Sequence, residues 1–365
     1  LAGSHDIDIF VLYEYRKYVD KSTELSDFLE PVLRKTFLRT KIQRIHGSRD
    51  YFRLLFAGFI FEVVPILKIS KPEQAINITD ISPLHSAWVN KHAATIKDDI
   101  RLLKQFCKAN KLYGAESYIG GFSGYVLEIL TAHYGSFEKV LKASQRWKDK
   151  EVIDPSKFYK GKEALFHINT SKLQSPIIVI DPVDKSRNAA AALSREKSAL
   201  LKEVAKKYLQ HPGEKFFVKE EVSLSSLRKK HKGTIFYLSI MPLEGKEDVV
   251  GGKLLKVFQL VKQKLDQFGV QESGWDWDKE KEAVMYFTLK KKELPAYEVK
   301  MGPPLKMKEY VEDFKKKYKN TFEEKGRIKA KVKAEHPKLK DFVKAVLKEN
   351  YCKEKIKQVK KASVV

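Results

Sequence analysis

The order of apolar and polar residues predicts a sheet at the start of the chain. In residues 6–12, three apolar side chains alternate with Asp6 and Asp8. Strand side chains point alternately to opposite faces, so the two carboxylates share one face and the apolar side chains take the other. Residues 58–65 form a second, largely apolar run that contains Glu62. We therefore expect three carboxylates on neighbouring strands.

Helical periodicity follows in the middle of the chain. Residues 22–39 and 84–147 carry apolar side chains three and four positions apart, which is typical of helices packed on one side. A short buried segment at residues 177–180 precedes an Ala-rich stretch that predicts a helix ending near residue 209.

The last third of the chain predicts a β-α-β arrangement with helices on one face. A long helix is expected at residues 248–268, and a hairpin tip at residues 275–277. Beyond residue 304 the chain is Lys-rich, and we expect it to be helical. Four strands are expected at residues 216–222, 234–240, 283–289 and 297–301. The predicted fold class is α+β with several domains.

Composition narrows the range of partners. The 365 residues carry a net charge of +24, with 43% hydrophobic and 11% aromatic residues, so the chain is globular and favours a polyanion such as nucleic acid. No apolar run is long enough to span a membrane and no secretory signal is visible. Cys107 and Cys352 lack metal-ligand or disulfide spacing and are expected to be reduced thiols in a cytoplasmic protein.

Two interpretations of the carboxylates remain open from the residues alone. Three carboxylates on adjacent strands need cations, and hard oxygen ligands favour Mg²⁺, two of which could support in-line attack on phosphorus. Alternatively, Asp6 and Asp8 are solvated at a strand edge and Glu62 lies alone at the rim of a core.

Seven motifs occur in order along the chain and carry a family resemblance. They are Gly3-Ser4-x-Asp6-x-Asp8, Phe61-Glu62-Val63-Val64-Pro65, Ser82-Pro83-Leu84-His85, Arg101-Leu102-Leu103-Lys104, Asn110-x-x-Tyr113-Gly114-Ala115-Glu116, Gly121-Phe122-Ser123-Gly124-Tyr125 and Asp181-Pro182-Val183-Asp184-x-x-Arg187-Asn188. In these motifs the chain resembles the archaeal-type, class I CCA-adding enzymes, which are tRNA nucleotidyltransferases. The resemblance covers about residues 1–200 and is looser beyond them.

The resemblance implies a fold and an activity. It implies a nucleotidyltransferase palm with a mixed sheet in residues 1–90 and a helical neck with a base-reading segment in residues 91–211. It further implies a split β-α-β body in residues 212–304 and a basic helical tail in residues 305–365 that binds tRNA. The implied reaction is template-independent addition of C, C and A to tRNA 3′ ends from CTP and ATP, with Mg²⁺. The tRNA acceptor end and minihelix are the implied partners, and a homodimer is left open.

The resemblance also assigns roles to individual residues. Lys104 alone would be interpreted as a solvated charge, His85 as a core-edge histidine and Tyr113 as a packing aromatic. The matched positions are the metal carboxylates Asp6, Asp8 and Glu62, the triphosphate-binding Ser82, His85, Lys104 and Tyr113, and the base-reading Arg187.

Two departures from the family pattern matter. The family normally has Asp where this chain has Glu62, and a change of reach at a metal site shifts its geometry. The family also has an earlier Gly-Ser motif, ahead of the carboxylate strand, that grips the triphosphate. This chain lacks it, and we expect that an N-terminal truncation removed it, since Leu1 is not an initiator methionine. The alternatives are a non-catalytic or split tRNA-binding relative and a poly(A)-type nucleotidyltransferase.

Overall fold

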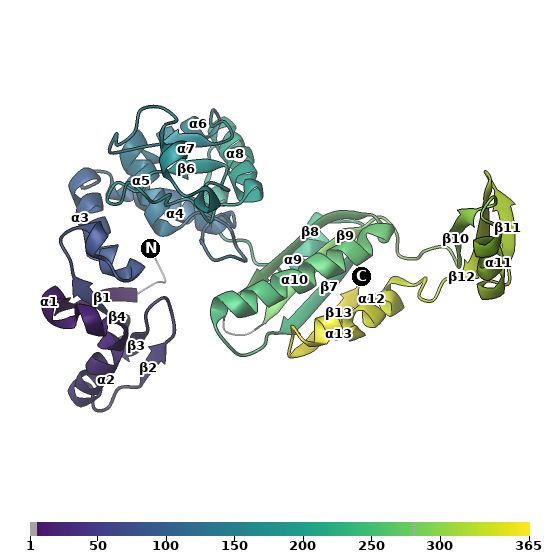
Figure 1. Ribbon diagram of the computed structural model, residues 1–365, viewed down its shortest axis with the longest axis horizontal. Coiled ribbons are helices and arrows are strands. Elements are labelled where there is room, and N and C mark those ends of the chain that lie inside the picture. Colours follow the sequence, from purple (N-terminus) through teal and green to yellow (C-terminus); the bar gives the residue numbers. More distant parts are fainter. Residues whose placement is uncertain (1–5, 280–281) are drawn as a thin grey trace. The chain divides into compact units, whose positions relative to one another are not determined.

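The computed structural model describes residues 6–279 and 282–365. The chain divides into two compact units, Leu1–Glu220 and Glu221–Val365 (Figure 1). Each is a mixture of helices and strands, which confirms the α+β class. Gly3 and Ser4 of the first motif and the side chain of Asp6 lie outside the description.

The first unit begins with a four-stranded mixed sheet in the order β1-β4-β3-β2. Strands β1 and β4 are parallel, and the other pairs are antiparallel. Helix α2 packs Leu29 and Leu33 against Phe52, Leu54 and Val63 on one face of the sheet. The elements are β1 (Asp6–Glu14), α1 (Tyr15–Tyr18), η1 (Val19–Glu24), α2 (Leu25–Thr36), β2 (Ile42–Ile45), β3 (Tyr51–Phe56) and β4 (Phe59–Lys68).

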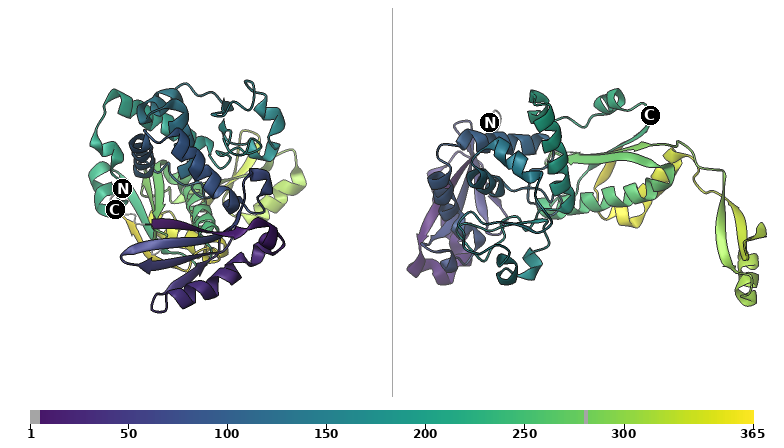
Figure 2. Two further views of the ribbon diagram at one scale, coloured as in Figure 1. Left: turned by 90° about the vertical axis from the view of Figure 1, so that its left-hand side faces the viewer. Right: turned by 90° about the horizontal axis from the view of Figure 1, so that it is seen from above.

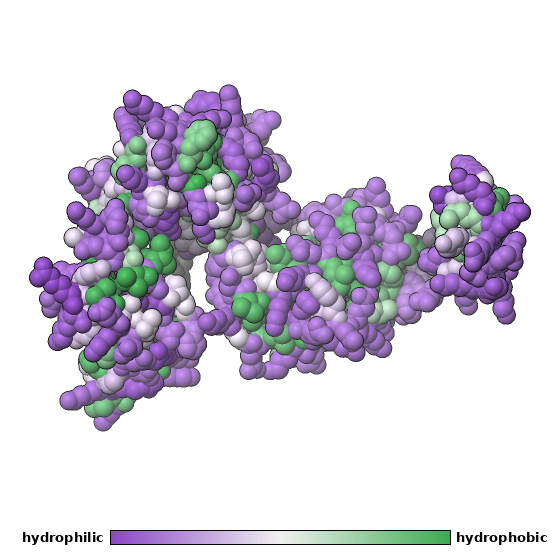
Figure 3. Space-filling view, viewed as in Figure 1, coloured by the Kyte–Doolittle hydropathy of each residue, from purple (hydrophilic) through white to green (hydrophobic). Residues whose placement is uncertain are grey.

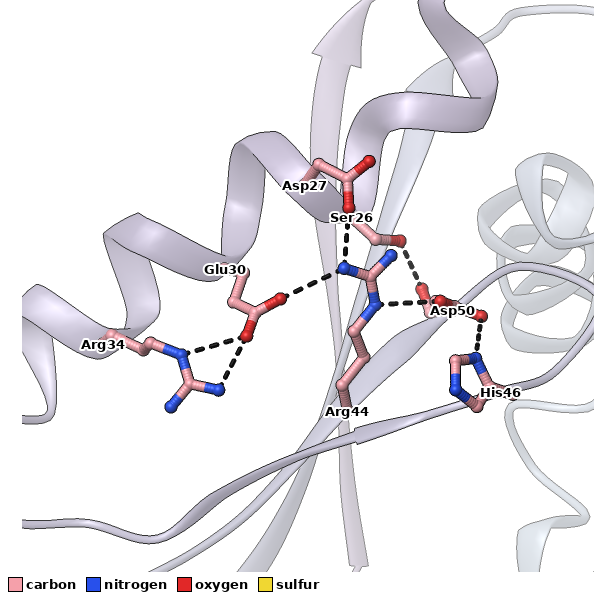
Figure 4. Close-up of polar contacts among 7 residues, drawn as sticks. All are labelled: Ser26, Asp27, Glu30, Arg34, Arg44, His46 and Asp50. Atoms are coloured by element: carbon pink, nitrogen blue, oxygen red, sulfur yellow. Dashed lines mark hydrogen bonds and ion pairs between the residues drawn. The ribbon is translucent and has the colours of Figure 1, made fainter. Parts of the chain in front are cut away.

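A polar network fastens α2 to the β2 edge of this sheet (Figure 4). The guanidinium of Arg44 on β2 donates to Asp27 at 2.6 Å and to Glu30 at 3.1 Å, both on α2. It also donates to Asp50 at 2.8 Å, and the imidazole of His46 lies 2.9 Å from the same carboxylate. Such a cluster fixes the helix against the strand more firmly than a single exposed ion pair would.

A buried ion pair sets the path from the sheet to the next helix. Arg49 and Asp80 are both buried and form an ion pair. Asp80 also accepts hydrogen bonds from the backbone N–H of Leu67 and of Asn77, each at 2.9 Å. Two 3₁₀ turns, η2 (Pro72–Gln74) and η3 (Ile78–Ile81), therefore hold a fixed position where α3 (Ser82–His92) begins.

The rest of the first unit is a helical layer around one core. Helices α4, α5, α6 and α8 enclose Leu103, Phe106, Leu127 and other apolar side chains, and Val179 of the small parallel β5–β6 pair joins them. The elements are α4 (Lys97–Ala109), α5 (Gly124–Tyr134), α6 (Phe137–Ser144), β5 (Glu151–Ile153), α7 (Ala164–His167), η4 (Thr170–Lys172), β6 (Ile177–Val179), α8 (Arg195–Gln210) and η5 (Glu214–Phe217). The expected helices between residues 84 and 147 are confirmed.

Two expectations for this region are wrong. The Ala-rich stretch before residue 195 does not enter the helix, because Ser194 caps α8 by accepting from the N–H of Lys197. The strand expected at residues 216–222 does not form. Phe216 instead lies in the 3₁₀ turn η5, and its side chain is buried against the helical core.

The second unit is built on a four-stranded antiparallel sheet in the order β13-β7-β9-β8. Helix α10 lies lengthwise across one face, which confirms the long helix and the one-sided packing (Figure 2). The elements are α9 (Leu224–Lys230), β7 (Thr234–Met241), α10 (Glu247–Leu265), η6 (Asp266–Phe268), β8 (Val270–Trp277), β9 (Ala283–Leu289), α12 (Leu339–Lys348), α13 (Asn350–Lys353) and β13 (Gln358–Val364).

The prediction of a hairpin tip at residues 275–277 is wrong, because Trp275 and Trp277 lie within β8. Both side chains pack against the helix-covered core.

The expected all-helical tail is also wrong. Residues 297–333 form a small sheet, β10-β12-β11, with one helix. In β12, Ile328 and Ala330 are buried while lysines take the intervening positions, so the lysines occur at strand and not helix spacing. Strand β13 pairs with β7 and completes the sheet of the second unit. The elements are β10 (Tyr297–Pro304), α11 (Lys308–Lys317), β11 (Thr321–Glu324) and β12 (Arg327–Lys333).

The surface agrees with the composition. Hydrophilic residues dominate the face shown in Figure 3, over both units. Within the described residues, no helix is long and apolar enough to cross a membrane.

Candidate active site

The register of β1 and β4 places two of the predicted metal carboxylates side by side. Asp8 is the direct partner of Glu62 in this parallel pair, and Asp6 is the partner of Ile60. Paired residues of neighbouring strands project to the same face, so Asp8 and Glu62 share one face of the sheet, as the alternation predicted. Asp8 is exposed and Glu62 is half-buried.

Glu62 has a cationic partner that the sequence did not indicate. Arg53 lies opposite Glu62 in the β3–β4 pair. Its Nε and Nη2 atoms donate to Oε1 of Glu62 at 3.0 Å and 2.5 Å. The interpretation of Glu62 as a lone carboxylate at a core rim is therefore wrong, because Arg53 neutralises it at the face that it shares with Asp8.

The donor set fits a hard divalent cation as far as it is described. Carboxylate oxygens are the ligands that Mg²⁺ prefers, and two carboxylates lie on adjacent strands of one face. Among the side chains that the structure describes, no three His, Cys, Asp or Glu groups cluster to hold a metal ion. The side chain of Asp6, the third predicted ligand, is not in that set.

A second group of predicted residues meets at the N-terminus of α5. Lys104 on α4 forms an ion pair with Glu128 on α5, with 2.5 Å between Nζ and Oε1. A Cβ added at Gly124, the first residue of α5, would lie 2.9 Å from Oη of Tyr113 and 3.6 Å from Nζ of Lys104. The absence of a side chain at Gly124 therefore lets the amine and the phenol reach the start of the helix.

The chemistry of this cluster suits an anion. Ser123 caps α5 by accepting from the N–H of Val126 at 3.2 Å, and the partial positive charge of a helix start favours negative groups. Burial raises the pKa of Tyr113, and the nearby Lys104 charge opposes that rise. The Tyr113 hydroxyl thus stays protonated near neutral pH and can donate a hydrogen bond beside the Lys104 ammonium.

A third group assembles around a buried carboxylate. Nε2 of His85 on α3 lies 3.1 Å from Oδ2 of Asp181, and Nη1 of Arg187 donates to the same oxygen at 2.6 Å. The hydroxyl of Tyr125 on α5 donates to Oδ1 at 3.0 Å. The ring of His85 stacks on the ring of Tyr125, with centroids 4.0 Å apart. Two residues predicted to bind the nucleotide, His85 and Arg187, therefore share one anchor.

The structure places Ser82 on α3, but no described contact joins it to the groups around Gly124 or Asp181. It is the first residue of α3, three positions before His85, so the two side chains lie near one face of the helix. Its side chain is half-buried.

Comparison with known proteins identifies the family. Residues 98–218 match the model described as tRNA nucleotidyltransferase, second domain, and residues 241–362 match the model described as CCA-adding enzyme, C-terminal domain. A CCA-adding enzyme of Nanoarchaeum equitans is 36% identical over 306 residues, which cover 82% of this chain and 72% of that protein. The chain belongs to the CCA-adding enzyme family.

Other relatives of the family agree. A CCA-adding enzyme of Methanosarcina acetivorans is 29% identical over 87% of this chain and 69% of its own length. One of Pyrobaculum islandicum is 30% identical over 84% of this chain and 69% of its own length. Among solved structures, a Cid1 poly(U) polymerase with Mg and 3′-dATP covers 59% of this chain and 81% of its own, at 13% identity and a TM-score of 0.42. The family and the enzyme class inferred from the seven motifs are confirmed by the sequence relatives.

The sequence assigned no role to several residues that lie in the candidate site of this member of the CCA-adding family. Asp181, Tyr125 and Gly124 stand in the quoted motifs, but nothing in the sequence shows what they touch. Asp181 meets His85 across 96 positions of the chain. Arg53 and Glu128 carried no signal, because a single charged residue in a strand or helix is usually solvated.

Proposed function

We propose that this protein adds C, C and A to the 3′ end of tRNA, using CTP and ATP without a template. In this reaction the tRNA 3′-hydroxyl attacks the α-phosphorus and pyrophosphate leaves. Transfer of this type depends on positioning and electrostatic stabilisation, so the side chains that hold the nucleotide carry much of the catalytic effect. Membership of the CCA-adding family supports the substrate and the reaction.

The observation that supports the proposal is the convergence on the start of α5 of two groups of residues that the family resemblance predicts to bind the nucleotide. Gly124 gives Lys104 and Tyr113 access to the helix N-terminus, and the adjacent Tyr125 binds Asp181. A triphosphate suits the ammonium, the phenol and the helix start, and Lys104 would have to share its charge with Glu128 or release that carboxylate, since the two form an ion pair. Arg187, whose side chain is 32% exposed, carries donors that suit acceptor atoms on a base edge.

Asp6, Asp8 and Glu62 are the residues that would hold Mg²⁺. Bound there, Mg²⁺ supplies charge stabilisation at the triphosphate and increases the acidity of the tRNA 3′-hydroxyl. Asp8 and Glu62 would contribute oxygen ligands from one face of the sheet. Arg53 would have to share Glu62 with the metal or release it, since it donates to Oε1.

The test supplies tRNA that ends at the discriminator base, together with Mg²⁺ and labelled CTP or ATP. The expected product gains two CMP residues and then one AMP. Incubation with CTP alone separates the proposal from a poly(A)-type transferase, which would leave the tRNA unlabelled. Failure to label the tRNA with either nucleotide would overturn the proposal.

One observation favours a second candidate, a tRNA-binding relative without transfer activity. Glu62 stands where the family normally has Asp, and its Oε1 atom is taken by Arg53. A protein of this kind would bind tRNA and leave its 3′ end unchanged. The labelling experiment, run beside a tRNA-binding measurement, decides between the two candidates.

A further inference from the structure

Asp181 is a fully buried carboxylate, with no exposed surface. Four donors occupy its two oxygens. Oδ2 accepts from Nε2 of His85 and Nη1 of Arg187, and Oδ1 accepts from the Tyr125 hydroxyl and from the N–H of Val183 at 2.9 Å. The donors come from α3, from α5 and from the turn that follows β6. One side chain therefore ties together three segments that are distant in the sequence.

This carboxylate is charged at any pH near neutrality. Burial by itself would raise the pKa of Asp181, but the hydrogen bond and charge of His85, the N–H of Val183 and the charge of Arg187 outweigh it and hold the pKa at about 2. A buried charge is tolerated only when it is fully paired. An anion in this position would repel a triphosphate, so it is unsuited to bind a nucleotide directly and can act only through its partners.

Asp181 and Arg187, at the two ends of the turn after β6, are joined through both their backbones and their side chains. The backbone N–H of Asp181 donates to the carbonyl of Arg187 at 3.0 Å, while the side chains of the two residues form the ion pair at 2.6 Å. A long Arg side chain loses rotamer entropy when it is fixed on binding. Asp181 already holds Nη1 of Arg187 in the free protein. Part of this entropy is therefore lost when the protein folds and not when the nucleotide binds.

We propose that Asp181 is the positioning residue for nucleotide selection, holding Arg187 and His85 in one fixed arrangement at the α5 N-terminus. The inference rests on the proposed function, in which Arg187 reads the base and His85 binds the triphosphate. The acceptor-only carboxylate requires Nε2 of His85 to carry the hydrogen, so Nδ1 is the ring nitrogen that faces the nucleotide. Asp181 itself touches neither the substrate nor the reacting atoms.

The principal test is Asp181→Asn, which has almost the same shape. The amide can still accept from Tyr125, but its NH₂ group cannot accept from His85 or Arg187. The measurement is kcat/KM for CTP, ATP and UTP on tRNA ends. We expect the preference for CTP and ATP over UTP to fall about ten-fold, with KM rising more than kcat falls. The tRNA dissociation constant should stay within a factor of two.

A double-mutant cycle shows whether Asp181 acts through Arg187. If it does, Asp181→Asn should lower selectivity in the wild type and have no further effect on selectivity in an Arg187→Ala background. A matched control is Asp99→Asn, because Asp99 is a carboxylate of the same unit that accepts from the N–H of Phe137 at 2.9 Å. It should lower the unfolding temperature without changing selectivity.

A milder variant keeps the inference testable if Asp181→Asn does not fold. Tyr125→Phe removes one donor to Oδ1 and retains the ring that stacks on His85, so we expect a smaller loss of selectivity, about three-fold. Equal slowing of all three nucleotides by Asp181→Asn, or by Tyr125→Phe where only that variant folds, would overturn the positioning role and leave a structural one.

The proposed function and this inference can fail separately. If the wild type binds labelled CTP and ATP better than UTP but does not transfer them, the transfer activity is refuted. The positioning role is then judged by whether Asp181→Asn lowers that binding preference about ten-fold. If the wild type transfers nucleotides and Asp181→Asn keeps full selectivity, only the inference is refuted. A wild type that neither transfers nor discriminates nucleotides refutes both.

Discussion

Adding one methyl group at Gly124 tests the packing at the start of α5. The new Cβ would lie 2.9 Å from Oη of Tyr113, and ordinary van der Waals contact needs about 3.5 Å. Tyr113 or the first turn of α5 must therefore move by about half an ångström. Overpacking of this kind costs about 1–3 kcal/mol, towards the lower end here because the crowded atom is the end of a side chain, and the gain of about 0.5–1 kcal/mol for Ala in place of Gly applies to helix interiors and is smaller at this first helical position. We expect Gly124→Ala to lower the free energy of unfolding by about 1 kcal/mol.

The predicted loss of stability in Gly124→Ala comes from the contact with the Tyr113 hydroxyl, so removing that hydroxyl should abolish the loss. In a Tyr113→Phe background the clash is absent, and Gly124→Ala should then be neutral or stabilising. The expected coupling between the two substitutions is about 1–3 kcal/mol. Nucleotide binding should behave differently. Both single variants and the double variant should raise KM for CTP and ATP alike, because each disturbs or removes the same donor to the triphosphate.

The assay is urea unfolding of the four proteins, followed by tryptophan fluorescence. Trp88 and Trp147 lie in the first unit and Trp275 and Trp277 in the second, so the fluorescence reports the transitions of both units, and the variants show which transition moves. The control is Gly252→Ala in the middle of α10, where an added Cβ has nothing within 4 Å. It should stabilise the second unit by up to about 1 kcal/mol and leave KM unchanged. If the effects of Gly124→Ala and Tyr113→Phe on unfolding simply add, the reasoning about the hydroxyl is refuted.

Four further predictions concern other parts of the molecule. Glu62→Gln should slow nucleotide transfer about a hundred-fold or more without weakening tRNA binding, whereas Glu62→Asp should stay active; equal single-turnover rates for Gln and wild type would contradict a metal-ligand role. Since the pKa of Asp181 falls from 3.8 to about 2 on folding, its charge should contribute about 2 kcal/mol of stability above pH 4, lost as the pH falls towards 2; urea unfolding of wild type and Asp181→Asn should converge over that range. Replacing the three lysines at residues 315–317 of α11 with Gln should reduce the log–log salt slope of tRNA binding by up to about 2–3, and an unchanged slope would place the phosphate contacts elsewhere. Burial raises the pKa of the Cys107 thiol, so iodoacetamide should label Cys107 only under unfolding conditions, as mass spectrometry would show.

Local patterns predicted the elements that bury one face. The alternation in residues 6–12 and the helical spacing in residues 84–147 both depend on short-range periodicity, and both elements form as expected. The lysines of β12 misled the interpretation of the C-terminal part, because frequent Lys was interpreted as helical while Ile328 and Ala330 are buried at strand spacing. The strand expected at residues 216–222 failed since Phe216 packs into the helical core.

The contacts of the candidate site could not be predicted, because they join residues far apart in sequence. Asp181 meets Tyr125 across 56 positions and His85 across 96, and no periodicity encodes such a pairing. The Arg53–Glu62 ion pair depends on the register of β3 with β4. A one-residue change of register would place Arg53 on the opposite face of the sheet. The motifs predict which residues bind the nucleotide and the metal, but only the fold shows which of them share a partner.

The two groups that we propose to bind the nucleotide are attached to the same helix terminus, and this has a consequence for selectivity. Gly124 and Tyr125 are consecutive, and Gly124 adjoins Lys104 and Tyr113 while the hydroxyl of Tyr125 donates to Asp181. A displacement of the first turn of α5 would therefore alter the proposed phosphate-binding groups and the proposed base-reading residue, Arg187, together. Binding of the triphosphate by Lys104 and Tyr113 would in turn restrict that turn, so the base would be read in a more uniform arrangement. On this argument, selection of the base depends on the triphosphate being bound, and a nucleoside that lacks phosphates should bind with little preference for cytosine or adenine over uracil.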